Sequence, residues 1–201
     1  MPYYTAADEE EIYDFMQQHS FVTLIGYDGE FPVATQVPVA VHREAGLTKL
    51  IGHVMTKTNH HEAFQRHPNV MAIFTGAHSY VSASVYENPK SASTWNYKTV
   101  QVKGKIRLLT KDETYQIIKD ITDKYEKPDS SPAAFHKMDE DYIQKNLAAI
   151  TGFEILVSNI SHVFKMSQNH SIKNRENIIA NLEHADDALS AEVAREMRKD
   201  L

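Results

Sequence analysis

In Val100-Gln101-Val102-Lys103-Gly104-Lys105-Ile106-Arg107-Leu108, small or apolar residues alternate with polar ones along the whole length. Side chains of a strand point alternately to its two faces, so the pattern predicts a strand with one buried face. Gly104 gives this face a place to bend, which the closure of a sheet into a barrel requires. The stretch therefore indicates a long strand of a curved sheet.

A second alternating segment lies earlier in the chain, where the odd-numbered residues from Val33 to Val41 share one face. Pro38 interrupts the hydrogen-bond ladder of this strand, which predicts an edge strand or a bulge, and such places often border sites. Asp28-Gly29 predicts the hairpin turn before it. Further strands are expected at residues 21–25, 48–53, 70–74, 80–84, 153–157 and 162–166.

Two helices are expected in the first third of the chain. Thr5 with Asp8 resembles a capping box, and apolar residues at helical spacing follow, which predicts a helix near residues 6–18. Asn59 is suited to cap a short helix that ends before Pro68.

The second half of the chain shows stronger helix signals. Thr110 with Glu113 forms a clear capping box before an amphipathic helix, and a further helix is expected near residues 139–149. The charged tail, residues 172–201, is also predicted to be helical. Two apolar clusters are expected in that tail, one formed by Ile178, Ile179 and Leu182 and the other by Leu189, Val193 and Met197.

This order of elements predicts the fold class. Consecutive strands with short turns favour a mainly β, antiparallel barrel with peripheral helices, which is an α+β protein. The chain shows no repeats and no low-complexity tract. We therefore expect residues 1–201 to form a single domain with a helical C-terminal tail.

The charge of the chain limits its partners. The formal net charge is −6 and the sequence pI about 6.0, whereas binding to nucleic acid or anionic membranes requires clustered Lys and Arg. The chain has no cysteine, which excludes disulfides, thiolate catalysis and cysteine-based metal sites. No apolar run approaches the roughly 20 residues that span a bilayer, and the first residues do not resemble a signal peptide. We expect a cytoplasmic protein that does not enter membranes.

Two short segments are suited to a planar ligand with polar edges. Thr94-Trp95-Asn96-Tyr97 contains the only Trp of the chain, and Lys165-Met166-Ser167-Gln168-Asn169 ends the last predicted strand. Each combines hydrogen-bonding groups with an aromatic or apolar body. Nothing in the chain is equally suited to acid–base chemistry, since Ser167 has no evident base partner. The two segments favour a ligand-binding barrel.

These segments also carry a family resemblance. Three further motifs accompany them: Gly52-His53 comes before the first segment, Gly152-Phe153-Glu154 lies between the two, and Arg175-Glu176-Asn177 follows the second. Motifs in this order along the chain resemble the PaiB-type family of FMN-binding negative transcriptional regulators. That family belongs to the wider group with the pyridoxamine 5'-phosphate oxidase-like split barrel. The resemblance implies a six-stranded antiparallel split β-barrel of the FMN-binding type. It also implies a homodimer with FMN at the subunit interface, where both protomers contribute to each site.

The resemblance carries site residues over to this chain. Residues 34–38 resemble the strand along the flavin ring, and residues 53–59 resemble the phosphate end. A lysine, a hydroxyl and the amides at a helix start suit an anion. The segments around Trp95 and Ser167 resemble contacts to the ring and its carbonyls. The cofactor-binding residues implied are Thr35, Gln36, Val37, Pro38, His53, Lys57, Thr58, Asn59, Thr94, Trp95, Asn96, Lys165, Ser167 and Gln168.

Several alternatives stay open at this point. The family label implies a regulator or flavin sensor, and DNA binding follows from that label alone, without a basic patch or recognition motif. The chain could instead be an FMN-dependent oxidoreductase acting on a small molecule, or a dimer that has lost its cofactor, as Val85 and His170 suggest where the family usually has Trp and Arg. The eleven histidines lack the spacing of a metal site, so no metal is expected, although one of them could ligate haem.

Overall fold

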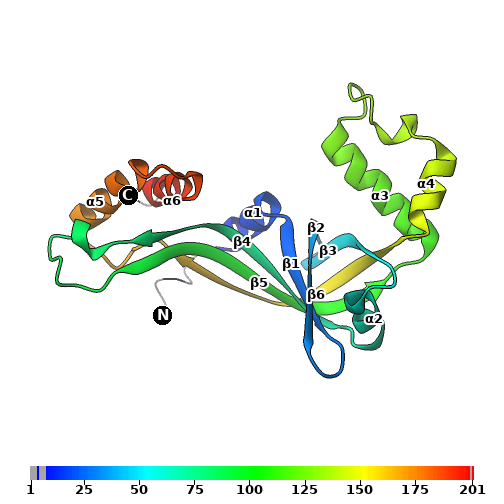
Figure 1. Ribbon diagram of the computed structural model, residues 1–201, viewed down its shortest axis with the longest axis horizontal. Helices are drawn as coiled ribbons and strands as arrows, with labels where there is room; N and C mark the ends of the chain where they lie inside the picture. The colour runs from blue at the N-terminus through cyan, green and yellow to red at the C-terminus, as the bar shows by residue number, and fades with distance from the viewer. Residues whose placement is uncertain (1–3, 5–7, 200) are drawn as a thin grey trace. The chain divides into compact units, whose positions relative to one another are not determined.

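The computed structural model describes residues 4, 8–199 and 201. Within this part of the chain, no helix has both the length and the apolar character needed to cross a membrane. Six strands and six α-helices are present there, with short 3₁₀ turns at Ala83–Val85 and Phe135–Lys137 (Figure 1). The elements are α1 Glu9–Gln18, β1 Phe21–Tyr27, β2 Pro32–Glu44, β3 Leu47–Met55, α2 Asn59–Arg66, β4 Asn69–Val81, β5 Thr94–Leu108, α3 Lys111–Glu126, α4 Glu140–Leu147, β6 Ile150–Lys165, α5 Ile172–Glu183 and α6 Ala188–Lys199.

The six strands form one closed sheet in the order β1-β2-β3-β6-β5-β4. β2 pairs with β1 and β3, β1 pairs with β4, and β3 pairs with β6, each pair antiparallel. The prediction of a mainly antiparallel, six-stranded sheet with peripheral helices is therefore confirmed. Apolar side chains fill its interior, and the largest of them, including Leu24, Leu50, Phe74 and Phe153, are fully buried. Burial of each such side chain contributes about 1.5–3 kcal/mol.

Two long strands of the structure, β4 and β6, were each predicted as two shorter strands. Residues 70–74 and 80–84 were expected as separate strands, but β4 runs unbroken from Asn69 to Val81. Likewise, β6 runs unbroken from Ile150 to Lys165 through Asn159, which was expected in a turn. At both places the alternation of buried residues is interrupted, so the local pattern resembles a turn while the strand continues.

Helix starts follow the backbone conformation rather than residue type alone. The capping box of Thr110 and Glu113 is confirmed at α3. The cap of α2 is Thr58, in extended conformation, and Asn59 is already helical, so the predicted cap was wrong by one residue. α1 begins at Glu9 after the cap Asp8, later than expected, and the predicted cap Thr5 lies outside the described residues.

Pro38 does not lie on an edge strand, which corrects that part of the prediction. β2 has a neighbour on each side, and Pro38 is the last residue paired with β1, opposite Phe21. The ladder with β3 starts at the next residue, Val39, opposite Gly52. The proline therefore marks the point where β2 changes its pairing partner, so its missing N–H costs little there.

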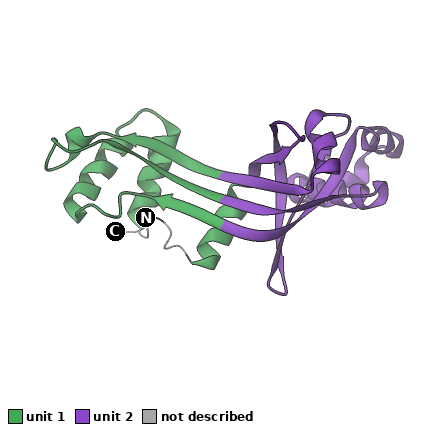
Figure 2. Ribbon diagram, turned by 90° about the horizontal axis from the view of Figure 1, so that it is seen from below, with its two compact units in different colours: residues 1–19, 75–100, 161–201 green, residues 20–74, 101–160 purple. Residues whose placement is uncertain are grey.

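The described chain divides into two compact units, coloured separately in Figure 2. Unit 1 comprises residues 1–19, 75–100 and 161–201, and unit 2 comprises residues 20–74 and 101–160. β4, β5 and β6 each contribute residues to both units. The single domain stays a prediction.

Unit 1 contains the helices α5 and α6. One apolar cluster joins them to β4 and to the turn after β6, so the two clusters expected in the tail are one. Leu189 is not part of it, because its side chain is 44% exposed. The remaining predicted residues, Ile178, Ile179, Leu182, Val193 and Met197, are buried in this cluster.

Candidate functional site

The alternation of β2 divides the four residues predicted to lie along a flavin ring. Val37 is buried in the barrel, and Thr35 lies on the same inner face. Gln36 and Pro38 lie on the outer face, and Gln36 is exposed. Only these two can offer side chains to a ligand outside the barrel, while the other two can offer backbone groups alone.

Pro38 belongs to a row of outer-face residues in unit 2. Phe21 of β1 lies opposite Pro38. Gly52 of β3 lies opposite Val39, so the next residue, His53, falls beside Pro38. The row therefore combines an aromatic ring, a proline ring and an imidazole on neighbouring strands.

Exposed apolar side chains mark the same outer face. Phe21 is 67% exposed and Met55, two residues beyond His53, is 55% exposed. Water rarely faces such large apolar groups without a functional reason when they cluster. Neither residue was predicted as a site residue from the sequence, although the alternation of residues 21–25 already assigns Phe21 to the face opposite the buried Val22.

His53 has a polar atom that nothing described satisfies. Its Nδ1 is buried and has no hydrogen-bond partner among the described residues. Burial lowers the pKa of His53 below its ordinary value, so the ring is neutral at pH 7. A buried nitrogen without a partner costs free energy.

The turn after β3 holds the residues predicted for a phosphate. Lys57 has a left-handed backbone, with φ of 59°, and its side chain is exposed. Thr58 Oγ1 donates to Met55 O at 3.0 Å and accepts from the His61 amide at 3.3 Å. The His60 amide donates to Asn59 Oδ1 at 2.8 Å. Two first-turn amides of α2 are therefore already occupied, so side-chain cations must supply much of the attraction for an anion.

The second predicted group gathers in unit 1, at the start of β5 and the end of β6. Lys165 Nζ donates to Thr94 Oγ1, and Ser167 Oγ donates to Asn96 Oδ1 at 3.0 Å. Gln168 bonds the backbone of residues 164 and 166. The structure therefore brings all these polar residues of the two segments together, as hydrogen-bonded neighbours.

Two members of this group have almost no surface left for a ligand. Asn96 is 0% exposed and Ser167 1% exposed. Asn96 also donates from Nδ2 to Met197 Sδ at 3.3 Å, which ties β5 to α6. Their hydrogen bonds are internal, so within one protomer they support the segments rather than face solvent. Their cofactor role stays a prediction.

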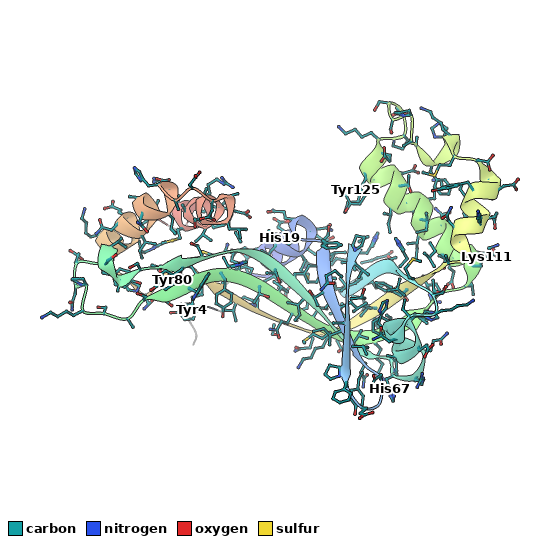
Figure 3. The ribbon with its side chains drawn as sticks, in the orientation of Figure 1. Tyr4, His19, His67, Tyr80, Lys111 and Tyr125 are labelled. Carbon is teal, nitrogen blue, oxygen red and sulfur yellow. The ribbon has the colours of Figure 1, made fainter. Side chains whose placement is uncertain are left out.

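Trp95, in contrast, is 53% exposed. Its ring lies 5.8 Å from Tyr80 in an edge contact and 6.2 Å from His78. Tyr80, labelled in Figure 3, is itself 52% exposed. The three residues form an aromatic surface on β4 and β5, which is able to cover a flat ring.

The two predicted groups thus lie in different units: residues 35–38, 53 and 57–59 in unit 2, and residues 94–96, 165, 167 and 168 in unit 1. The described residues form one cavity of about 480 Å³ and another of about 570 Å³, and neither group of predicted residues lines either of them. His53 is partly buried, and Gly152, its neighbour on β6, donates from its amide to Thr114 Oγ1 of α3 at 2.9 Å. Among the described residues, no group of three His, Asp or Glu is arranged to hold a metal ion.

The cavity of about 480 Å³ lies in unit 1 and has a buried cation at its wall. Lys98 Nζ lies 3.2 Å from Glu11 Oε1 and 2.9 Å from Glu196 Oε2, and 4.8 Å from the Phe164 ring centroid. Burial lowers the pKa of Lys98, but its bonds with Glu196 and Glu11 outweigh burial and raise the pKa. Lys98 therefore stays charged and joins α1 and α6 to β5.

Replacing Lys98 by Met is expected to lower the free energy of unfolding by about 3 kcal/mol, because two carboxylates then lose their shared cation. Burial raises the pKa of Glu196, but Lys199 and Lys98 hold it below its ordinary value. The stability that this carboxylate contributes is present above its unfolded pKa of 4.5 and is lost as pH falls through the folded pKa. Urea denaturation across this acid range measures both effects.

The control for this change is Lys199→Met, since Lys199 bonds Glu196 at Oε1 while its side chain is 65% exposed. We expect it to cost less than about 1 kcal/mol. Equal losses in the two variants would contradict a special role for the buried Lys98.

Comparison of the chain with known proteins identifies its family. Residues 1–159 match the family model described as "Putative FMN-binding domain". The chain is 29% identical over 199 residues to "Protease synthase and sporulation protein PAI 2" of Bacillus subtilis (strain 168). That match covers 99% of this chain and 96% of the relative.

Solved structures share the fold. The FAD and heme binding protein from Mycobacterium smegmatis matches with a TM-score of 0.62 at 17% identity, over 88% of this chain and 79% of that chain. The flavocytochrome Anf3 from Azotobacter vinelandii also matches with a TM-score of 0.62, at 13% identity, over 81% of this chain and 70% of that chain. At these identities the likeness concerns the fold alone.

Proposed function

The chain belongs to the family of FMN-binding domains, and we propose that it binds FMN non-covalently on the outer face of β2 and β3, in a barrel of the FMN-binding split type. The observation that carries this proposal is the row of outer-face residues in which Pro38 and His53, with its unsatisfied Nδ1, lead to Lys57 and Thr58. Bound FMN would supply one- and two-electron redox chemistry that no side chain of this chain provides.

The residues of the face fit the parts of FMN. Phe21, Pro38 and Met55 offer an apolar surface to the flat ring, and Gln36 offers an amide to its polar edge. His53 Nδ1, without a proton on it, accepts a hydrogen bond, and with one it donates. Lys57 supplies a positive charge to the phosphate.

A second copy of the chain would complete the site. Phe21 and Met55 of this face are largely exposed, whereas sites for small ligands usually enclose most of the ligand surface. The exposed Trp95 and Tyr80 provide a matching aromatic surface. We therefore propose a homodimer in which Trp95 of the partner subunit covers the flavin, so that each site takes residues from both protomers.

We further propose that the protein acts as a flavin-responsive negative regulator in the cytoplasm, as the PaiB-type resemblance implies. The relative from Bacillus subtilis supports this only through its name. The net charge of −6 disfavours direct DNA contact, so regulation through a protein partner fits better. A gel shift with specific DNA at physiological salt would contradict that preference.

The test of FMN binding is an absorbance spectrum of the purified protein before and after incubation with FMN and gel filtration. We expect flavin absorbance to co-elute with a dimer. A protein that remains colourless after incubation with FMN would overturn the proposed function. A haem-type absorbance band in place of flavin would direct attention to the histidines.

A further inference from the structure

His60 lies on the first turn of α2, and its ring is held against the helix start. Its Nε2 lies 2.9 Å from Thr58 Oγ1, and its ring centroid lies 6.0 Å from that of Phe64. The side chain is half-buried. These contacts keep the imidazole at the end of α2 where Lys57 precedes the helix.

The hydrogen bonds of Thr58 determine which nitrogen of His60 carries the proton. The Thr58 hydroxyl has one proton, which it donates to Met55 O, and it accepts from the His61 amide. Its remaining lone pair is free to accept, so His60 Nε2 donates to it. In the neutral ring, Nδ1 is then a bare acceptor, which repels a phosphate oxygen. A proton on Nδ1 turns this repulsion into a charge-assisted hydrogen bond.

The surrounding groups keep His60 neutral in the absence of a ligand. Burial lowers the pKa of His60, and the neighbouring His61 lowers it further. His61 is itself buried, with Nε2 3.3 Å from Thr151 Oγ1 of β6.

Acidic groups do not offset this effect at the helix start. Glu62 lies in the first turn of α2, but its carboxylate pairs with Arg66 of the last turn at 3.1 Å. α2 packs on β1 and β2, and Asp28, in the turn that joins them, interacts with the same Arg66. Among the described residues, neither of these carboxylates forms an ion pair with His60, so an arriving anion would supply its counter-charge.

We propose that His60 is a phosphate-binding residue that takes up a proton on Nδ1 when FMN binds. The inference rests on the proposed function, since it assigns the phosphate of FMN to this end of α2. Bound phosphate raises the pKa of His60, so the extra affinity is fully present below the pKa of His60 in the free protein and is lost as pH rises through the raised pKa of the complex. Lys57 then contributes a constant charge and His60 a pH-dependent one.

The test compares wild type with His60→Gln by isothermal titration calorimetry, with FMN and with riboflavin, between about pH 6.5 and 8.5. Gln keeps a donor to Thr58 but cannot take up a proton. Buffers of different ionisation enthalpy report the protons bound. The second pKa of a phosphate monoester, about 6, affects both proteins equally. His67→Gln, at the far end of α2 beside Tyr27, is the matched control.

We expect wild type and His67→Gln to bind FMN about tenfold more tightly at the lower pH, the effect of one pKa unit. His60→Gln should lose this dependence and the proton uptake, and riboflavin should show neither. The same pH dependence of FMN binding in wild type and His60→Gln would overturn the role of His60 and leave FMN binding intact. A pH dependence of riboflavin binding that disappears in His60→Gln would also overturn the role of His60, since riboflavin lacks the phosphate. Absence of FMN binding in wild type at every pH would overturn both proposals.

Discussion

Replacing Lys57 by Glu is expected to weaken FMN binding by about a hundredfold. A hydrogen bond to a charged group contributes about 2 kcal/mol, and the new carboxylate adds repulsion of the phosphate. Each factor of ten in affinity corresponds to about 1.4 kcal/mol. The left-handed backbone at this position strains Lys and Glu alike, so the fold should not change. Fluorescence titration with FMN measures the affinity.

Lys124→Glu is the matched control, because Lys124 is an exposed lysine of α3 whose amine lies over the neighbouring Tyr125 ring, 5.5 Å from its centroid. It should leave FMN affinity unchanged. An equal loss in both variants would indicate general electrostatics rather than a phosphate contact. Riboflavin should bind Lys57→Glu as well as wild type, since it lacks the phosphate.

The Lys57→Glu variant also tests the shared site. Co-expression with Trp95→Ala under two affinity tags yields mixed dimers. If Trp95 acts on the partner's site, one site of the mixed dimer carries both changes and the other carries none. We then expect about one FMN per dimer at wild-type affinity. If both residues serve the same protomer, no intact site remains, and this result would contradict the proposed arrangement.

Replacing Gly104 by Ala is expected to lower the free energy of unfolding by about 3 kcal/mol. A Cβ at this position would lie closer to the Leu156 carbonyl oxygen than van der Waals contact allows. It would also lie 2.7 Å from Ile155 Cγ2, which is again too close. The obstacle is mainly backbone of β6, which cannot rotate away, so the strands must separate. Guanidinium denaturation of the FMN-free protein measures the loss.

Lys105→Ala is the control for this change, because the neighbouring Lys105 is exposed and its loss should shift stability by less than about 0.5 kcal/mol. An unchanged midpoint for Gly104→Ala would mean that β5 and β6 are farther apart than the structure has them. The sequence analysis assigned Gly104 to a bend, whereas the structure adds a stricter reason, the close approach of the next strand.

Local patterns predicted the elements whose signals are local. The alternation of residues 100–108 and 33–41 and the capping box at Thr110 all correspond to observed elements. The same alternation also indicates that Gln36 and Pro38 lie opposite Thr35 and Val37. The alternation alone therefore leaves only two of these four predicted residues, Gln36 and Pro38, with side chains on the side of the proposed flavin ring.

Local patterns failed where long-range contacts decide. Gly76-Ala77 and Asn159 interrupt the alternation and resemble turns, but β4 and β6 continue because neighbouring strands pair with them. Thr58 and Asn59 are both good caps, and only the extended backbone of Thr58 selects between them. Leu189 continues an apolar pattern, yet α6 turns it towards solvent.

Near-neighbour patterns in the sequence were sufficient to predict an antiparallel sheet, helices around it and a supply of hydrogen-bonding and aromatic residues, because strand alternation and helix caps are local. Which polar groups are satisfied became visible only in the folded chain. Asn96 and Ser167 bond each other across 71 positions of the chain, while the buried Nδ1 of His53 has no partner among the described residues. Whether a polar group is already satisfied depends on what folding brings beside it, and residue type does not contain that information.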